Sequence, residues 1–323
     1  TRLADGRSIT VDALSNPRQL GNTRTLAARA ADMVAFYAGL AGSAPYPSFT
    51  LLSLESDLPG GHSPAYFAAI NQPSPQSQVT WRHDPIAFDD RFPDVFLAHE
   101  VAHQWWGQGV GVKNYHEQWL SEGLAQYFAW RYAGQVRGPD VQRALLDRMK
   151  ASVRRYNDSG PIAMGYRLGH VVGDGSNFRA IVYNKSVVVL DLLGRLIGQD
   201  VFDRGLRRFY QEMQFRKAGA DDLRRAMEAE SGQPLGRFFD RWVHESDLPQ
   251  VSLSAVVEHQ GDAAVIRVVQ TGPVFDLPVT LTIAYADGPA GSVTLAVHDA
   301  VTERRIPLAG RVKPGGIRLV PVL

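Results

Sequence analysis

Residues 96–108, FLAHEVAHQWWGQ, restrict the fold of this chain more than any other stretch of its sequence. His99 and His103 are four residues apart, and Glu100 directly follows the first histidine. Residues at this spacing lie one turn apart on the same face of an α-helix, so both imidazoles can reach one metal ion. A catalytic zinc site uses three protein ligands and an open position for water, and a helical HExxH pattern supplies two ligands and a proton-accepting carboxylate. The same spacing also occurs in amphipathic helices that merely carry two surface histidines.

A third ligand is expected on a second helix that packs beside the first. Glu122 lies 19 residues after His103, within WLSEG. That gap leaves room for the first helix to end, for a glycine-containing loop, and for a second helix to return. His116 and Glu117 are competing ligands, but they fall at or before the start of the second helix. We therefore interpret them as capping or solvated residues.

Composition narrows the possible chemistry. The chain has 323 residues and no cysteine, which removes thiolate zinc sites, disulfides and a cysteine nucleophile. Its net charge of +1 gives no electrostatic signature of binding to nucleic acid or to an anionic membrane. The most apolar window, 180–198, is interrupted by charged residues and predicts a buried helix of a soluble protein. We expect neither a nucleic-acid partner nor membrane contact by this segment.

The hydrophobic pattern changes along the chain from mixed to helical and then to alternating. The first part predicts a helix and four strands, at 22–42 and at 7–13, 48–56, 65–70 and 77–82. The second part predicts helices near 91–107, 117–134, 139–156, 177–197, 199–214, 219–231 and 235–244. From Val251 onward, valine-rich alternating segments predict an antiparallel sandwich of roughly six or seven strands.

These motifs resemble those of the aminopeptidase N and leukotriene-hydrolase family of gluzincin zinc metallopeptidases. HEVAHQWWG and WLSEGLAQY match two blocks of that family closely, except that members usually carry Asn where this chain has Ser121. The resemblance covers roughly residues 25–250. It implies an α+β fold, with a thermolysin-like catalytic domain (a small mixed sheet followed by a helical lobe) and a C-terminal antiparallel β-sandwich.

The resemblance also implies a division into domains. We expect residues 1–14 to be a linker remnant or edge strand, 15–248 to be the zinc peptidase domain, and 249–323 to be the β-sandwich domain. The family's large N-terminal β-domain has no counterpart in the sequence, which implies that the chain is part of a longer protein. The compartment is unknown from the residues themselves, and the resemblance alone points to an extracytoplasmic setting, periplasmic or membrane-tethered.

The family uses a tyrosine about sixty residues after the glutamate ligand, at a helix start in a Tyr-x-Lys-Gly context. Here Tyr183 lies 61 residues after Glu122 and two residues before Lys185, and Ser186 replaces the usual glycine. By resemblance, Tyr183 donates its hydroxyl to the tetrahedral oxyanion, where a positioned donor contributes strongly to catalysis. Without the family pattern, a tyrosine at a helix start that packs its ring in the core would be the preferred interpretation.

One loop departs from the family pattern. The family's exopeptidases carry a Gly-x-Met-Glu-Asn loop on an edge strand, whose glutamate pairs with the α-amine of the substrate and whose backbone aligns the peptide. The corresponding stretch here, LPGGHSPAY at 58–66, has His62 and Ser63 about where the glutamate and asparagine belong. We expect Gly60, Gly61 and His62 to contact substrate, the glycines through their backbone groups. Exopeptidase and endopeptidase activity both remain open.

The sequence therefore predicts an enzyme, a zinc metallopeptidase of the aminopeptidase type, with one Zn²⁺ per chain and a peptide as substrate. By this interpretation His99, His103 and Glu122 bind zinc, Glu100 is the general base toward a zinc-activated water, and Tyr183 stabilises the oxyanion. The alternatives are a non-catalytic protein-interaction module on a peptidase scaffold and a hydrolase of a non-peptide substrate.

Overall fold

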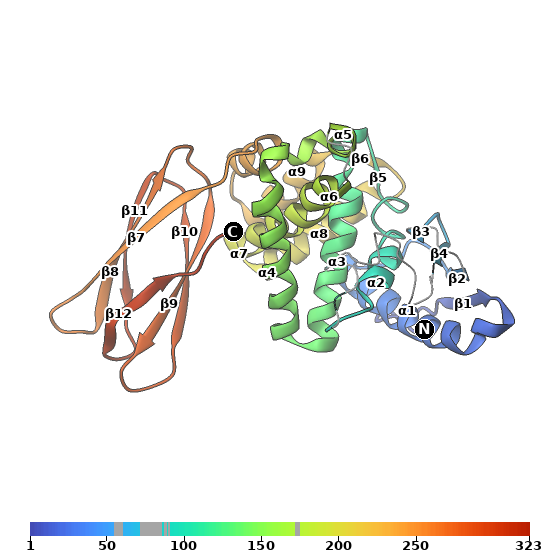
Figure 1. Ribbon diagram of the computed structural model, residues 1–323, viewed down its shortest axis with the longest axis horizontal. Coiled ribbons are helices and arrows are strands. Elements are labelled where there is room, and N and C mark those ends of the chain that lie inside the picture. Colours follow the sequence, from blue (N-terminus) through green and yellow to red (C-terminus); the bar gives the residue numbers. More distant parts are fainter. Residues whose placement is uncertain (55–60, 72–85, 87–88, 90, 172–174) are drawn as a thin grey trace.

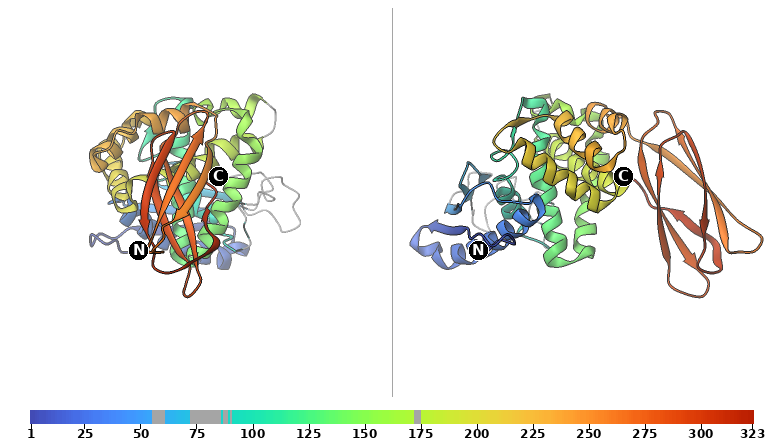
Figure 2. Two further views of the ribbon diagram at one scale, coloured as in Figure 1. Left: turned by 90° about the vertical axis from the view of Figure 1, so that its left-hand side faces the viewer. Right: turned by 180° about the vertical axis from the view of Figure 1, so that it is seen from behind.

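The computed structural model describes residues 1–54, 61–71, 86, 89, 91–171 and 175–323. Over these residues the chain forms a small sheet, then a helical lobe, then two antiparallel sheets, which follow one another along the long axis of the molecule (Figures 1 and 2). The predicted α+β fold is confirmed. No helix in the described part of the chain is both long and apolar enough to span a bilayer.

The first sheet is mixed and has the strand order β1-β2-β4-β3. Its strands are β1 (Thr10–Ser15), β2 (Ser48–Leu54), β3 (Gly61–His62) and β4 (Phe67–Asn71). The first three strands in this order are parallel, whereas β3 runs antiparallel to β4 at one edge. The predicted strand at 77–82 lies outside the described residues. The antiparallel edge strand matters most for function, because it comes to lie beside the HExxH motif.

Helix α1 (Leu20–Ala41) connects β1 to β2 and packs against the sheet and the helical lobe. Its buried residues recur at helical spacing, and it ends at Gly42, whose φ of 92° suits a left-handed C-terminal cap. Within the core the hydroxyl of Tyr37 donates to the carbonyl of Ala98 at 2.9 Å. This bond ties α1 to the helix that carries the motif.

The helical lobe holds the predicted helices with altered ends. Its main elements are α2 (Val95–Ala102), α3 (Trp119–Arg137), α4 (Pro139–Tyr156), α5 (Arg167–Val171), α6 (Gly175–Phe178), η6 (Arg179–Lys185), α7 (Ser186–Ile197), α8 (Gln199–Met213), α9 (Ala220–Ser231), α10 (Gly236–Phe239) and η7 (Asp240–His244). The helix predicted at 177–197 is instead three segments, α6, the π-helix η6 and α7. The helix predicted at 91–107 is shorter, because α2 covers only Val95–Ala102, and the chain then turns toward Gly107, which has a φ of 114°.

The C-terminal part contains six strands in two antiparallel three-stranded sheets, β10-β9-β12 and β11-β8-β7. The strands are β7 (Gln250–Val257), β8 (Ala263–Thr271), β9 (Leu277–Tyr285), β10 (Gly291–Val297), β11 (Val301–Pro307) and β12 (Val312–Leu319). In β8 the side chains of Ala264, Ile266 and Val268 alternate inward into the core. The prediction of an antiparallel β region from Val251 onward is confirmed.

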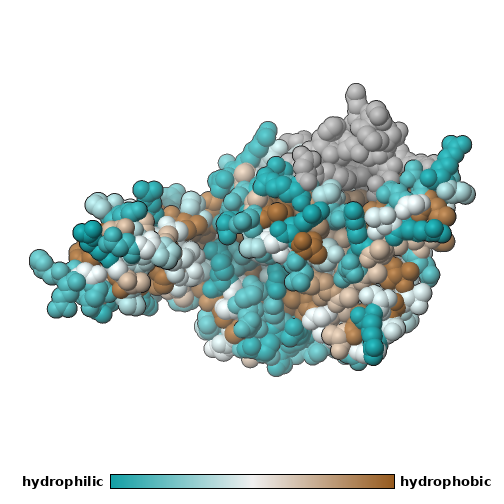
Figure 3. Space-filling view, turned by 90° about the horizontal axis from the view of Figure 1, so that it is seen from below, coloured by the Kyte–Doolittle hydropathy of each residue, from teal (hydrophilic) through white to brown (hydrophobic). Residues whose placement is uncertain are grey.

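The sandwich extends from the helical lobe as a narrower body, and on the face seen from below hydrophilic residues are interspersed with smaller hydrophobic groups (Figure 3). The two bodies meet through specific contacts. The ring of Trp242 packs edge-on against Phe275 with centroids 5.2 Å apart, and Lys150 donates from Nζ to the carbonyl of Pro321 at 3.3 Å. The exact domain boundaries stay a prediction.

Candidate active site

Three side chains from two packed helices converge on one point. His99 lies in α2, His103 caps the C-terminal end of that helix, and Glu122 lies in the first turn of α3. The Nε2 atoms of the two histidines are 3.0 Å apart, and each lies 3.3 Å from Oε2 of the glutamate. The structure therefore brings together the three residues that the spacing predicts as metal ligands.

The spacing of these three atoms fits zinc. Tetrahedral ligands at about 2.0–2.1 Å from a zinc ion lie about 3.3–3.4 Å from one another. The three observed separations of 3.0, 3.3 and 3.3 Å are close to that value. Two imidazoles and one carboxylate are also a donor set found at catalytic zinc sites with an open fourth position.

The ring of His103 is oriented by the loop that follows α2. Its Nδ1 lies 2.8 Å from the carbonyl of Trp106, so Nδ1–H donates there and Nε2 presents its lone pair to the cluster. The hydroxyl of Ser121 donates to the same carbonyl at 3.3 Å. A Cβ atom at Gly107 would lie 2.6 Å from that hydroxyl, so this turn requires glycine. Ser121 therefore supports the ligand loop.

The electrostatics of the cluster favour a positive charge. Burial lowers the pKa of His103, but the charge of Glu122 and the hydrogen bond with it outweigh burial and raise that pKa to about 9. Burial raises the pKa of Glu122, yet the two histidines hold it well below its usual range. The carboxylate is thus a half-buried anion beside two imidazoles, as a divalent metal site requires.

The carboxylate of Glu100 faces the edge strand β3. Ser63, the residue after that strand, donates from Oγ to Oε2 of Glu100 at 2.5 Å, and both side chains are buried. A Cβ atom at Gly61 would lie 2.5 Å from Cδ of Glu100, so no side chain fits there. His62 lies between them and is exposed. Gly60, the remaining residue predicted to contact substrate, lies outside the described residues.

A glutamine after the motif holds the edge of the sheet in place. The side-chain amide of Gln104 donates to the carbonyls of Pro64 and Phe67 at 3.0 and 3.2 Å, and its Oε1 accepts from the backbone N–H of Tyr66 at 2.9 Å. Tyr66 has a φ of 73°, which is uncommon for a residue other than glycine. The connection between β3 and β4 is thereby fastened to the end of the motif helix.

Tyr183 comes from the π-helix η6 and stands over the ligand cluster. Its ring stacks on that of His99 with centroids 5.5 Å apart, and it meets Phe178 edge-on at 5.6 Å. Burial, followed by the charge and hydrogen bond of Glu122, raises the pKa of Tyr183 well above 10. The phenol therefore stays protonated and can act as a hydrogen-bond donor at neutral pH.

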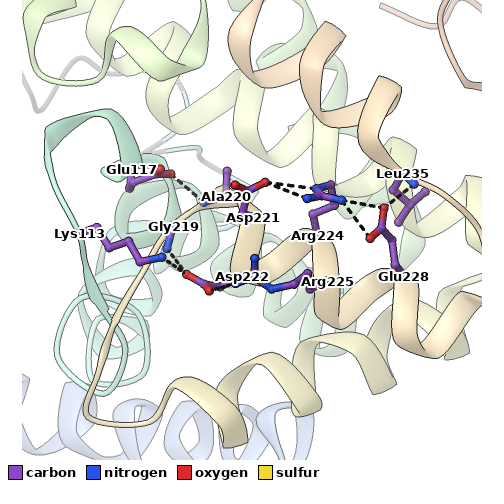
Figure 4. A network of polar contacts seen from close by, with 10 residues as sticks. All are labelled: Lys113, Glu117, Gly219, Ala220, Asp221, Asp222, Arg224, Arg225, Glu228 and Leu235. Atoms are coloured by element: carbon purple, nitrogen blue, oxygen red, sulfur yellow. Dashed lines mark hydrogen bonds and ion pairs between the residues drawn. The ribbon is translucent and has the colours of Figure 1, made fainter.

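The loop between the two ligand-bearing helices is clamped to α9 (Figure 4). Glu117 accepts a hydrogen bond from the backbone N–H of Ala220 at 2.8 Å, and Nζ of Lys113 lies 2.7 Å from Asp222. Glu117 thus caps a helix, as predicted, although the helix is α9 and not its own. His116 is exposed, and its Nδ1 lies 2.5 Å from the carbonyl of Ala163, away from the cluster.

These residues line a cavity of about 630 Å³. Glu100, Tyr183 and the three predicted ligands all contribute to its wall, together with Gly61 and His62 from the edge strand. Several further lining residues were not anticipated from the sequence, namely Ser63, Gln108, Gln126, Phe178, Arg179 and Asn184. The helical spacing of Arg179, four residues before Tyr183, was the one signal that could have placed it on the same face.

Comparison with known proteins adds an independent line of evidence. Residues 89–242 match the model of the peptidase family M1 domain. Aminopeptidase M1 of Arabidopsis thaliana is 26% identical over 192 residues, which cover 54% of this chain and 21% of the relative. Aminopeptidase N of Haemonchus contortus is 25% identical over 196 residues, covering 54% and 20%. The matched part thus spans about a fifth of the length of these curated relatives.

The fold is also found in a solved structure. The crystal structure of Legionella pneumophila aminopeptidase A in complex with aspartic acid superposes with a TM-score of 0.74, at 14% sequence identity. The match covers 95% of this chain and 35% of that chain. The small sheet, the helical lobe and the C-terminal antiparallel sheets therefore occur together in a known structure.

Proposed function

We propose, from the match of residues 89–242 to the peptidase family M1 domain, that the protein is a zinc-dependent peptidase of the aminopeptidase type. The observation that carries the proposal is the convergence of His99, His103 and Glu122 within 3.3 Å of one another in a cavity that also holds Glu100. Metal-assisted hydrolysis needs metal ligands and a general base. Here two imidazoles and one carboxylate can bind the metal, and a second carboxylate beside them can act as the base.

One zinc ion per chain would be held by Nε2 of each histidine and by the carboxylate of Glu122. When bound, the ion would act as a Lewis acid that lowers the pKa of a water molecule and polarises the substrate carbonyl. His103 is held in the required tautomer by its bond to Trp106, so its ligand nitrogen needs no reorientation.

Glu100 is placed to move the proton. Ser63 donates a hydrogen bond to Oε2 of Glu100, so we assign the proton transfer to Oε1. This oxygen accepts a proton from the attacking water and passes it to the leaving amine. The phenol of Tyr183 donates to the oxygen on which negative charge develops, and its high pKa keeps that proton in place. The two residues thus divide proton transfer and charge stabilisation between them.

An extended peptide would align along β3, the edge strand beside Glu100, by adding backbone hydrogen bonds to it. Among the described residues of the cavity wall, the carboxylates are Glu100 and Glu122, and both already have roles. The described wall therefore offers no further carboxylate for the α-amine of a substrate. Peptide hydrolysis, the general proposal, needs only the metal ligands and the base. Removal of amino-terminal residues, the finer proposal, also needs recognition of the α-amine.

Mass spectrometry of a mixed peptide library tests the proposal. We expect the zinc-loaded chain to cleave peptides and Glu100→Gln to lose nearly all cleavage. Loss of single amino-terminal residues identifies an aminopeptidase, and internal cuts or cleavage of N-acetylated peptides identify an endopeptidase. Equal digestion by both proteins would contradict the role of Glu100, and no digestion by either would favour a non-catalytic module or a non-peptide substrate.

A further inference from the structure

The hydroxyl of Ser186 lies at the junction between the π-helix η6 and α7. Ser186 is fully buried and is the first residue of α7. Its backbone N–H donates to the carbonyl of Tyr183, three residues back, and its Oγ donates to the carbonyl of Val182 at 2.6 Å. In a regular α-helix the N–H itself would bond four residues back, to Val182. The hydroxyl therefore takes the place of a backbone donor in the turn that carries Tyr183.

This junction packs against the helix that carries one of the predicted metal ligands. Gly123 in α3 directly follows Glu122. A Cβ atom at Gly123 would lie 2.3 Å from Cβ of Ser186 and 3.3 Å from the carbonyl oxygen of Val182, so no side chain fits at that position. The side chain of Ser186 thus sets the spacing between α3 and the turn before α7. Glu122 and Tyr183 are each directly adjacent in the chain to a residue of this contact.

Separate bonds fasten the last residues of η6 to another helix. Nζ of Lys185 donates to Oδ1 of Asn157, the residue that caps the C-terminal end of α4, at 3.0 Å. Nδ2 of Asn184 donates to Oγ of Ser152 in α4 at 3.3 Å. These bonds hold the end of η6 on the side of α4, whereas the hydroxyl at the junction holds it on the side of α3. The turn with Tyr183 is thereby fixed between two helices, and fixed helical segments keep the geometry of a site better than loops do.

We propose that Ser186 is a positioning residue that holds Tyr183 over the metal ligands. The ring of Tyr183 stacks on His99 with centroids 5.5 Å apart, and this placement depends on the backbone turn that the hydroxyl of Ser186 stabilises. A π-helical turn within an α-helical stretch is frequent at functional sites, because it changes the face on which a side chain lies. Loss of the hydroxyl lets the turn relax toward α-helical spacing and moves the phenol. The inference rests on the proposed peptidase function, in which Tyr183 stabilises the oxyanion.

A double-mutant cycle in the zinc-loaded chain tests whether Ser186 acts through Tyr183. Tyr183→Phe should lower kcat for peptide hydrolysis by about 100-fold, as the loss of an oxyanion donor does. Ser186→Ala should lower kcat by about fivefold or more with little change in KM, because a hydrogen bond of ordinary strength is lost. Added to Tyr183→Phe, Ser186→Ala should lower kcat no further, since the phenol through which it acts is already gone. Equal losses in both backgrounds would overturn the inference.

Thr25→Ala is the matched control. In α1 the Oγ1 of Thr25 donates to the carbonyl of Gly21, four residues back, at 3.2 Å, which is the same kind of bond on an exposed face. We expect Thr25→Ala to keep the kcat and KM of the parent chain. A loss of kcat as large as that of Ser186→Ala would mean that any such bond affects turnover through general stability, and it would refute a specific role for Ser186.

A second pair of variants tests the contact between α3 and the junction. Gly123→Ala places a methyl group 2.3 Å from Cβ of Ser186, so we expect a lower Tm in thermal unfolding. Addition of Ser186→Gly removes that Cβ and should restore part of the lost Tm. Ser186→Gly alone is measured beside the pair, because glycine itself lowers the stability of a helix. A double variant no more stable than Gly123→Ala would overturn the contact on which the inference depends.

Amide hydrogen exchange separates this inference from the proposed function, because it needs no turnover. In the chain supplied with zinc, Ser186→Ala should raise the exchange rate over residues 179–187 by about fivefold and leave α2 unchanged, whereas Thr25→Ala should leave both unchanged. Unchanged exchange over 179–187 in Ser186→Ala would overturn the inference even if the parent chain is an active peptidase. If the parent chain hydrolyses no peptide while exchange over 179–187 rises, the proposed function fails and the hold of Ser186 on the turn with Tyr183 is supported.

Discussion

Ser63 and Glu100 are joined by a 2.5 Å hydrogen bond between residues 37 positions apart in the sequence. The hydroxyl comes from the stretch after the edge strand, and the carboxylate comes from the motif helix. Because both side chains are buried, the bond fixes one carboxylate oxygen and leaves the other for proton transfer. The loop that departs from the family pattern thus supports the base directly.

Removal of that hydroxyl should slow the chemistry more than it weakens binding. A hydrogen bond to a charged group contributes about 1.5–3 kcal/mol, so we expect Ser63→Ala to lower kcat by about tenfold or more, with a smaller change in KM. Ser63→Thr, which retains the hydroxyl, should recover part of kcat. Steady-state kinetics measure both, and a kcat for Ser63→Ala equal to that of the parent chain would refute the positioning role.

Glycine at position 61 should be essential for activity but not for zinc binding. An alanine Cβ there would meet Cδ of Glu100 at 2.5 Å, so either the base or the edge strand must move. We expect Gly61→Ala to retain the metal and lose about 100-fold in kcat/KM, because a misplacement of about 1 Å at a catalytic group has that effect.

The matched control is Gly39→Ala in α1, where an added Cβ meets nothing within 4 Å. Alanine is favoured over glycine inside a helix, so this variant should gain about 0.5–1 kcal/mol in free energy of unfolding and keep its activity. If Gly61→Ala were as active as Gly39→Ala, the close approach between the edge strand and Glu100 would be wrong.

Lys185 should make stability depend on alkaline pH. Its side chain is fully buried and donates from Nζ to Oδ1 of Asn157 at 3.0 Å. Burial lowers its pKa to about 8, only partly opposed by Asp247, whereas the unfolded chain has the ordinary value near 10.5. Between these two pH values the unfolded chain binds more protons, so the free energy of unfolding rises with pH.

The expected rise is about 3 kcal/mol from pH 8 to pH 10.5, since one pKa unit corresponds to about 1.4 kcal/mol. Below pH 8 the lysine is charged in both states and contributes no slope. Urea unfolding of the parent chain and of Lys185→Met across this range measures the difference, because other titrating groups are common to both. If the free energy of unfolding changed with pH in the same way for the parent chain and for Lys185→Met, the pKa of the buried amine would not be lowered.

The ligand cluster could be predicted from sequence because its geometry is local. Helical periodicity alone places His99 and His103 on one face, and the gap before Glu122 suits a returning helix. The same periodicity could not reveal η6, because a π-helical turn is a rare insertion within an α-helical stretch. It also extended the motif helix to 107, whereas α2 ends at Ala102.

Contacts between distant segments were the other part that sequence could not supply. β3 is only two residues long and exists through its pairing with β4, so no periodicity marks it. The bonds from Gln104 to the connection between these strands depend on a fold that brings residues about forty positions apart together. Such pairings are decided by tertiary packing and not by local preference.

The central claim is a zinc site made by His99, His103 and Glu122, and metal analysis of purified protein tests it most directly. We expect one zinc per chain, retained in His116→Ala, whose ring lies outside the cluster, and lost in His103→Ala after dialysis against a weak chelator. Zinc at one equivalent in His103→Ala, or none in the parent chain supplied with zinc, would contradict the account.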